Sequence, residues 1–167
     1  IRATDKAGNA TEHSFVVDKT VPAFSVNSFY KAGQTVSITI TETNLDVVTL
    51  DGTVQGSTRS WSSNNLSEGS HTIVVTDKAG NSALKTFIVD KTAPAFNLNA
   101  FYNASETVTL VITEVNFDTV TLDGTATTQR EFAASEFDDG SHTVVATDKA
   151  GNSTTKTFII DTVSPDF

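Results

Sequence analysis

The pentapeptide Asp-Lys-Ala-Gly-Asn occurs three times in this chain of 167 residues, and its regular spacing restricts the possible folds more than any other feature. The copies lie at residues 5–9, 77–81 and 148–152, so successive copies begin 72 and then 71 residues apart. Self-similarity at a fixed period is the signature of a tandem array of like structural units. We therefore expect one small fold that is repeated along the chain.

The sequence around the pentapeptide recurs with the same spacing. Pro-Ala-Phe at 22–24 returns at 94–96, and the stretch 48–52 returns unchanged as 120–124. A repeated unit of this length is one compact element of an array, and neighbouring units are expected to contact one another.

These matches predict where each repeat begins and ends. The expected segments are 1–21, the last hairpin of a preceding repeat; 22–93 and 94–164, two full repeats; and 165–167, the start of a following repeat. We expect the chain to be part of a longer array. Because Pro94 fixes its own φ and biases Ala93 toward extended backbone, we also expect a short, semi-rigid joint between the full repeats.

Each repeat has the pattern of antiparallel β-structure. Val36, Ile38 and Ile40 alternate with Ser and Thr, which is the period of a strand with one buried face. Runs rich in Thr, Val, Ile and Phe are interrupted by Gly, Asn, Asp and Ser, as in a sandwich of short strands. In the first full repeat we expect strands near 23–27, 34–42, 46–52, 57–64, 70–77 and 82–90.

Charge and residue usage exclude several classes of function. Eleven basic and twenty acidic residues give a net charge of -9, which disfavours contact with phosphate backbones, so we expect no nucleic-acid partner. The longest apolar runs have three residues, so we expect no direct membrane insertion. The chain has no Cys, so it has neither disulfides nor a thiolate metal site.

The chain resembles the bacterial immunoglobulin-like repeats that occur in tandem in large surface adhesins and in extracellular enzymes. The resemblance rests on the hairpin at 76–81, the repeat end at 89–94 and the strand entry at 69–72, and it covers the whole chain. It implies an all-β fold of tandem immunoglobulin-like antiparallel β-sandwiches with Greek-key connections. It also implies an extracellular location, at the cell surface or cell wall.

The resemblance implies a spacer rather than an enzyme, because repeats of this kind mostly lift a head domain off the cell surface. We expect a non-catalytic stalk of a cell-surface or secreted adhesin, whose partners are neighbouring repeats and, through the parent adhesin, a host glycan or protein. Two alternatives stay open: a glycan- or protein-binding Ig-like module, and an accessory spacer of an extracellular carbohydrate-active enzyme. The segments 53–66 and 125–137 differ most between the repeats, which favours a binding module but is equally expected of unconstrained surface.

Carboxylate and amide side chains recur where predicted strands end. Because successive strands alternate in direction, two loops of each sandwich lie beside the outgoing strand of the preceding repeat. At the end of the first full repeat where these segments meet, we expect Asp18, Glu42, Asn44, Asp46 and Asp77. At the same end of the second repeat, we expect Asp90, Glu114, Asn116, Asp118 and Asp148. Unneutralised carboxylates repel one another, and a hard cation with about six to eight oxygen ligands relieves that repulsion. The sequence therefore predicts calcium at the junctions, as several members of the resembled family bind it.

A purely structural interpretation of the same residues stays open. Asp77 begins a tight hairpin, where its carboxylate can accept hydrogen bonds from turn amides while Gly80 supplies a positive φ. Asp90 precedes Lys91, so its charge can be satisfied without a metal. The Glu-x-Asn-x-Asp pattern also lacks the long loop and central glycine of an EF-hand.

Catalysis is not expected, and the large polar and aromatic residues are interpreted as structural. No nucleophile elbow, zinc-protease, P-loop or dinucleotide motif is present. Trp61 and Phe132 occupy equivalent places and are expected to fill the cores, since a sugar-stacking platform would need several aromatic residues on one face. His71 and His142 begin equivalent strands and are expected to bond back to the backbone, as a corner Tyr does in related sandwiches.

Overall fold

The computed structural model of the chain describes residues 1–166, so Phe167, in the predicted start of a following repeat, lies outside the described residues. The described residues form short strands and two single-turn 3-10 helices, which confirms the expected all-β fold. No helix among them is both long and apolar enough to cross a bilayer.

The strands follow one another in a recurring order. The first group is β1 Arg2–Thr4, β2 Ala10–Glu12, β3 Ala23–Ser25, β4 Phe29–Tyr30, β5 Thr35–Ser37, β6 Thr39–Thr41, β7 Leu45–Leu50, β8 Thr53–Val54, β9 Ser60–Ser62, β10 Gly69–Asp77 and β11 Ser82–Val89, with η1 at Ser63–Asn65. The second group is β12 Ala95–Phe96, β13 Phe101–Tyr102, β14 Thr107–Thr109, β15 Ile112–Thr113, β16 Phe117–Leu122, β17 Thr125–Ala126, β18 Glu131–Ala133, β19 Gly140–Asp148 and β20 Ser153–Ile160, with η2 at Ala134–Glu136.

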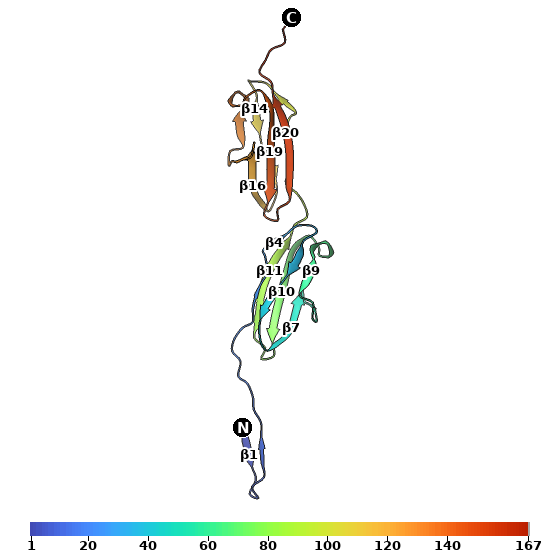
Figure 1. The fold of residues 1–167 in the computed structure, drawn as a ribbon, viewed down its shortest axis with the longest axis vertical. Helices are drawn as coiled ribbons and strands as arrows, with labels where there is room; N and C mark the ends of the chain where they lie inside the picture. The colour runs from blue at the N-terminus through green and yellow to red at the C-terminus, as the bar shows by residue number, and fades with distance from the viewer. Residues whose placement is uncertain (167) are drawn as a thin grey trace. The chain divides into compact units, whose positions relative to one another are not determined.

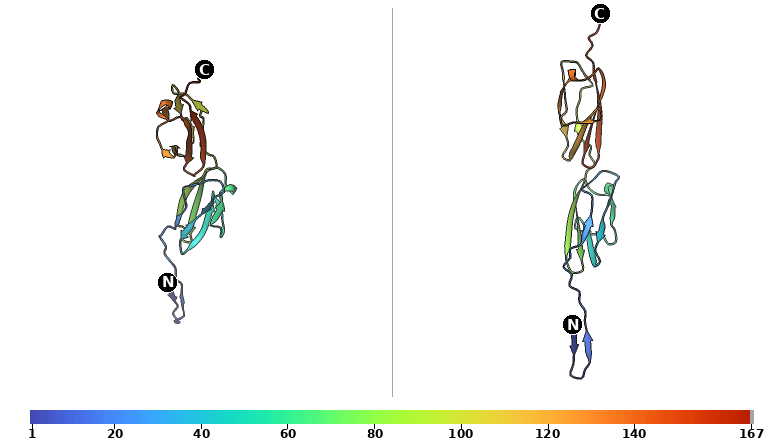
Figure 2. Two further views of the ribbon diagram at one scale, coloured as in Figure 1. Left: turned by 45° about the horizontal axis from the view of Figure 1, so that its top comes forward. Right: turned by 60° about the vertical axis from the view of Figure 1, so that its left-hand side comes forward.

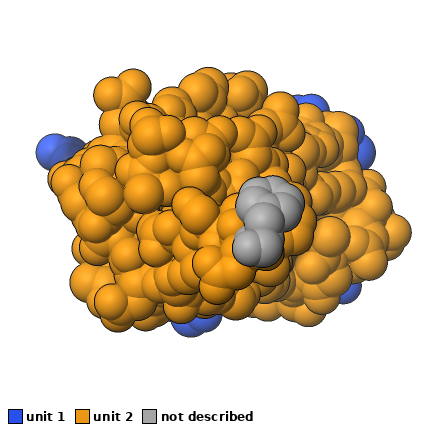
Figure 3. Space-filling view, turned by 90° about the horizontal axis from the view of Figure 1, so that it is seen from above, with its two compact units in different colours: residues 1–26, 38–59, 72–86 blue, residues 27–37, 60–71, 87–167 orange. Residues whose placement is uncertain are grey.

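Contacts within the chain divide it into two compact units (Figure 3). Unit 1 contains residues 1–26, 38–59 and 72–86, and unit 2 contains residues 27–37, 60–71 and 87–167. Strands β10 and β11 each have residues in both units. This division differs from the repeat boundaries expected from the sequence, which stay a prediction.

Unit 2 contains one complete sandwich, formed by β12 to β20. One sheet has the order β13-β20-β19-β16-β17, and Figure 1 shows β16, β19 and β20 side by side, as do the views in Figure 2. The pairs β12–β15 and β14–β18 make up the remaining strands. In β19 the side chains of Val144, Ala146 and Asp148 are buried at alternate positions, which is the pattern of a strand with one face in the core.

Aromatic and branched aliphatic side chains fill the core of this sandwich. Phe158 is 1% exposed and packs its ring edge-on against Tyr102 and Phe137. Phe132 is also buried, as expected. Its counterpart Trp61 lies opposite Val36 in the same register but is only half buried, so the expected core role holds fully for Phe132 alone.

The strand order of the second repeat also occurs in the first. The sheet there is β4-β11-β10-β7-β8, and the smaller pairs are β3–β6 and β5–β9. The predicted strand 34–42 is interrupted at Ile38, because its first part pairs with β9 and its second part with β3. The two-residue strand β4 was not predicted; it pairs in parallel with the end of β11, whereas antiparallel neighbours were expected.

The recurring Asp-Gly dipeptides make the tightest turns of the fold. Asp51 and Gly52 join β7 to β8, and Asp123 and Gly124 join β16 to β17. All four residues have positive φ, between 48° and 80°. Two-residue hairpin loops with positive φ at both positions match the right-handed twist of the strands and favour Asp-Gly, which explains why this dipeptide is present in both repeats.

Candidate metal centre and the junction residues

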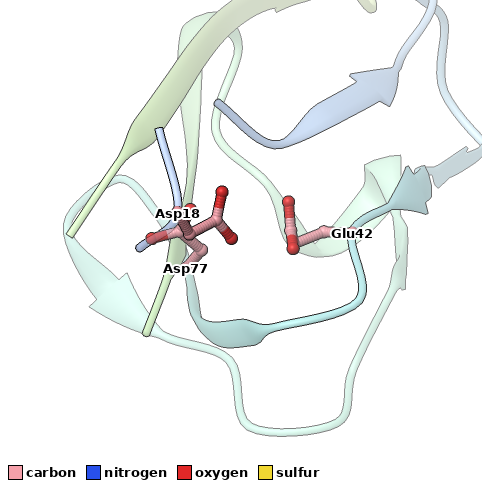
Figure 4. Close-up of side chains that lie close together, drawn as sticks. All are labelled: Asp18, Glu42 and Asp77. Atoms are coloured by element: carbon pink, nitrogen blue, oxygen red, sulfur yellow. The ribbon is translucent and has the colours of Figure 1, made fainter. Parts of the chain in front are cut away.

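Three predicted ligands converge within unit 1. One carboxylate oxygen each from Asp18, Glu42 and Asp77 lies within 4.8 Å of the other two. Figure 4 shows Asp18 and Asp77 close together, with Glu42 facing them. Asp18 precedes β3, Glu42 follows β6 and Asp77 ends β10, so the three come from segments far apart in the sequence. The expected gathering of these loops at one end of the strands is therefore seen for these residues.

The carboxylate of Asp77 is part of the hairpin that it begins. Its Oδ1 accepts hydrogen bonds from the main-chain amides of Ala79 and Asn81, both at 2.9 Å, and its Oδ2 accepts one from Asn81 Nδ2 at 2.8 Å. Burial opposes ionisation, but these bonds outweigh it and hold the pKa of Asp77 below its ordinary value. Asp77 is thus an ionised residue with a structural role, as the structural interpretation predicted.

Two asparagine side chains bind Asp18. Asn44 Nδ2 donates to Asp18 Oδ2, and Asn81 Nδ2 donates to the main-chain carbonyl of Asp18, each at 3.2 Å. The main-chain amide of Asn44 donates to Glu42 Oε1 at 2.7 Å. Asn44 therefore joins two of the clustered carboxylates, with its amide group acting as a hydrogen-bond donor.

The same arrangement occurs within unit 2 around Asp90. Asn116 Nδ2 donates to Asp90 Oδ2 at 2.7 Å, and Asn152 Nδ2 donates to the Asp90 carbonyl at 2.8 Å. The amide of Asn116 donates to Glu114 Oε1 at 2.8 Å, and Asn152 also binds Asp148. Asp90 and Asp148 are almost fully buried, at 3% and 1% exposed. The structure thus links four of the five predicted residues of this set through amide donors.

Two predicted ligands lie outside these clusters. Asp46 is exposed on β7, and Asp118 is exposed on β16. Each has entered a strand whose alternation points its side chain away from the buried face, which loop-based reasoning did not take into account. In residues 1–166 the trio at Asp18 is the single group of three carboxylates close enough to share an ion.

Sequence reasoning missed Asn81 and Asn152. Both end the repeated pentapeptide, and each donates to the Asp of its own hairpin and to the Asp of the outgoing strand. The signal was available, because Asn recurs at this position in all three copies. The turn interpretation of this hairpin involved only Asp77 and Gly80.

The chemistry of the clusters suits a hard cation or a network of amide donors. Carboxylate, amide and carbonyl oxygens are the ligands that calcium prefers. A carboxylate oxygen has two lone pairs, so an oxygen that already accepts one hydrogen bond can still bind an ion. Calcium at these clusters stays a prediction.

The two interior histidines are structural, as expected. His71 is 4% exposed, stacks on Phe87 and bonds through Nε2 to the Ser67 carbonyl at 2.9 Å. His142 stacks on Phe158 and bonds through both ring nitrogens to acceptors.

Comparison with known proteins identifies the type of domain. Residues 85–162 match the family model described as a bacterial Ig-like domain, which confirms the family and the Ig-like β-sandwich fold expected from the repeat motifs. No curated protein matches the sequence significantly.

Several solved structures match the chain at low sequence identity. The Bacteroides ovatus SGBP-B protein of a mixed-linkage glucan utilization locus, solved with a mixed-linkage heptasaccharide, is 17% identical with a TM-score of 0.32 over 80% of this chain and 43% of its own. Murine CEACAM1b is 10% identical with a TM-score of 0.44, over 84% and 100%. The ICAM-5 D1-D4 ectodomain fragment is 15% identical with a TM-score of 0.45, over 95% and 53%. The chain spans less than half the length of the first of these structures.

Proposed function

Residues 85–162 belong to the bacterial Ig-like domain family, and from this premise we propose that the chain is a non-catalytic spacer in the stalk of a cell-surface or secreted bacterial adhesin. Bacterial Ig-like domains are typically extracellular or at the cell surface, and many occur where a head domain must be held away from its anchor. The neighbouring repeats are the direct partners of each sandwich. A host glycan or protein would be bound by another part of the adhesin.

The tandem recurrence of one strand order carries this proposal. The sheets β4-β11-β10-β7-β8 and β13-β20-β19-β16-β17 repeat the same architecture within one chain. Strand β11 ends at Val89 and β12 begins at Ala95, so only a short segment connects the two repeats. Similar units with short connections add length in regular steps, which is what a spacer requires. The net charge of -9 would keep neighbouring stalks apart.

Calcium would stiffen the stalk at the cluster of Asp18, Glu42 and Asp77. The proximity of their carboxylate oxygens, within 4.8 Å, supports this part of the proposal. The corresponding carboxylates of the second repeat are Asp90, Glu114 and Asp148. A cation at either place would offset the repulsion between the carboxylates.

The spacer is tested by adding length. A second copy of residues 94–164 is inserted after residue 164, and the maximum dimension is measured by small-angle scattering. Strand β19 has nine residues, so a sandwich is roughly 30 Å long at about 3.4 Å per residue, and we expect an increase of at least that amount. An unchanged or smaller dimension would overturn the spacer function.

Calcium is tested on the same chain after treatment with a chelator. Millimolar calcium should raise Tm, and Glu42→Gln should weaken the response. Asp46→Asn is the matched control, because Asp46 is exposed and lies outside the cluster. A Tm that does not change with calcium would remove the metal from the proposal and leave the spacer intact.

A glycan- or protein-binding module is a second candidate, favoured by one surface feature. Val111 and Val115 are 70% and 96% exposed, and the equivalent residues of the first repeat are Thr39 and Thr43. Val111 lines an open groove of about 460 Å³ with Phe96 and others. This candidate is tested by probing a glycan array with the wild type and with the double variant Val111→Thr plus Val115→Thr. It requires that the wild type binds a glycan and that the double variant does not.

A further inference from the structure

We propose that two asparagine side chains of each repeat fix the aspartate that ends the preceding repeat, and that this asparagine clamp holds the connecting segment in place without a metal. The clamp consists of Asn44 and Asn81 on Asp18 at one junction, and of Asn116 and Asn152 on Asp90 at the other. The inference rests on the proposed spacer function, because a fixed connection matters where one repeat positions the next.

Every polar atom of Asp90 has a hydrogen-bond partner, and the clamp supplies two of the four partners. Its amide donates to the Tyr30 carbonyl at 2.9 Å, and its carbonyl accepts from Asn152 at 2.8 Å. Its Oδ2 accepts from Asn116 at 2.7 Å, and its Oδ1 accepts from the Thr92 amide at 3.1 Å. A residue that is 3% exposed needs such partners, because a buried polar atom without one is destabilising.

The clamp on Asp18 repeats this pattern with different residues. The Asp18 carbonyl accepts from Asn81, its Oδ2 accepts from Asn44 and its Oδ1 accepts from the Thr20 amide. Two places in one chain, about 72 residues apart, therefore share the same donors, acceptors and atom types. A chance contact would not be expected to recur in this detail.

Asparagine suits this role because its amide nitrogen carries two hydrogens. Asn152 uses Nδ2 to bind both Asp148 Oδ2 and the Asp90 carbonyl, each at 2.8 Å. Its own main-chain amide donates to Asp148 Oδ1 at 2.9 Å, which holds the side chain in position. Asn152 thus closes its own hairpin and also binds Asp90, the residue that ends the preceding repeat.

The loop asparagine of each clamp is also bound to the neighbouring hairpin through its main chain. The Asn116 carbonyl accepts from the Lys149 amide at 2.8 Å, and the Asn44 carbonyl accepts from the Lys78 amide at 2.8 Å. Each loop asparagine is therefore fixed through its backbone while its side chain donates to the aspartate. The connecting segment that follows is short and contains Pro94, which is buried and has a fixed φ.

The clamp and the calcium site make opposite demands on the loop asparagine. The clamp uses Nδ2 of Asn116 as a donor to Asp90 Oδ2, whereas a cation at this place would require an oxygen to face it. Asn116→Asp supplies an oxygen and removes the donor. It therefore distinguishes the two arrangements.

The test measures backbone mobility by NMR relaxation in the full chain with chelator present. We expect order parameters near 0.85 for Lys91, Thr92 and Ala93 in the wild type, falling below about 0.6 in Asn116→Ala and in Asn152→Ala. The residues 19–21 of the other junction should not change, so each variant carries its own control. Asn44→Ala should lower the order parameters of residues 19–21 and leave those of residues 91–93 unchanged.

Asn9→Ala is the matched control for loss of a hairpin asparagine. Asn9 makes the same bonds to Asp5 as Asn152 makes to Asp148, but in an exposed hairpin, so it should leave residues 91–93 unchanged. If Asn152→Ala does not fold, Asn116→Ala alone tests the clamp, because it leaves the hydrogen bonds between Asn152 and Asp148 in place.

Three results would be informative in different ways. Ordered residues 91–93 in wild type without calcium, loosened by Asn116→Ala, support the clamp. Residues 91–93 that are mobile without calcium, and ordered by it in wild type and Asn116→Asp, overturn the clamp and favour the metal. If Asn116→Ala loosens residues 91–93 but an inserted repeat does not increase the maximum dimension, the spacer function is overturned and the clamp is not.

Discussion

The Nδ1 atom of His142 lies 2.7 Å from Oδ2 of Asp123, while its Nε2 lies 2.9 Å from the carbonyl oxygen of Asp138. A carboxylate and a carbonyl only accept hydrogen bonds, so the ring makes both bonds when both nitrogens are protonated. Burial disfavours the charged ring, but the bonds to Asp123 and Asp138 outweigh burial and raise the pKa of His142 above 6.5. Burial likewise opposes ionisation of Asp123, and the bond from His142 nevertheless lowers the pKa of Asp123 below 3.8.

We expect this pair to make stability depend on pH. The raised pKa of His142 means that its contribution is complete below pH 6.5 and is lost as pH rises through the folded-state value. The lowered pKa of Asp123 means that its contribution is present above pH 3.8 and is lost as pH falls through the folded-state value. The pair therefore stabilises the fold most between pH 3.8 and pH 6.5.

His142→Gln should lower Tm by about 4 °C near the middle of that range, and by less in alkaline buffer. Thermal unfolding followed by circular dichroism at several pH values measures the difference. His13→Gln is the control, because His13 is exposed. An equal loss at acidic and alkaline pH would show that packing, rather than ionisation, explains the effect.

Phe158→Ala should be among the most destabilising changes in unit 2. The ring is 1% exposed and contacts Tyr102 and Phe137, so its removal leaves a cavity that costs about 3–5 kcal/mol. Urea denaturation measures the free energy of unfolding. Ile159→Ala is the matched control, since Ile159 is 37% exposed on the opposite face of β20, and a similar loss in both variants would contradict the described core.

Gly124→Ala tests the turn between β16 and β17. No atom lies within 4 Å of the added methyl group, so the cost comes from the backbone, whose φ is 80°. We expect a loss of about 1–2 kcal/mol in urea denaturation. Thr125→Ala controls for the change of side chain next to the turn. A neutral Gly124→Ala would mean that the turn does not need a left-handed residue.

Asp148→Ala and Asp5→Ala remove equivalent carboxylates from equivalent hairpins. Asp148 is 1% exposed, so losing it leaves buried amides without acceptors and should cost about 1–3 kcal/mol. Asp5 makes the same local bonds in an exposed hairpin, and its replacement should leave the main unfolding transition unchanged. Urea denaturation of both variants checks this, and equal effects would argue against burial as the cause.

Much of the fold could be predicted because local patterns determine it. The alternation around Val36 predicts a strand directly from residue type. The expected strand 46–52 was too long, because Asp51 and Gly52 form a two-residue turn. The parallel pairing of β4 with β11 and the interruption at Ile38 could not be predicted in this way. Both depend on which distant strand each segment pairs with, and the sequence near them carries no signal of that choice.

The candidate site was predicted in part for a similar reason. Asp18, Glu42 and Asp77 meet because loop positions follow from strand direction, which the repeat pattern indicates. Asp46 lies outside the cluster because one residue separates a loop from the exposed face of a strand, and strand ends are the least certain feature of a pattern. The full role of Asn81 and Asn152 could not be predicted from the local pattern, because each also donates to a carbonyl 63 or 62 residues away in the sequence.

The hairpin at residues 5–9 closes through the bonds of Asp5 to Ala7 and Asn9, all within five residues of sequence. Contacts this local form quickly, since little chain entropy is lost in bringing the partners together. Each pentapeptide thus offers its repeat an independent starting point for folding. A nascent array could begin to fold at any of its repeats, so lengthening the array would not slow the folding of each part.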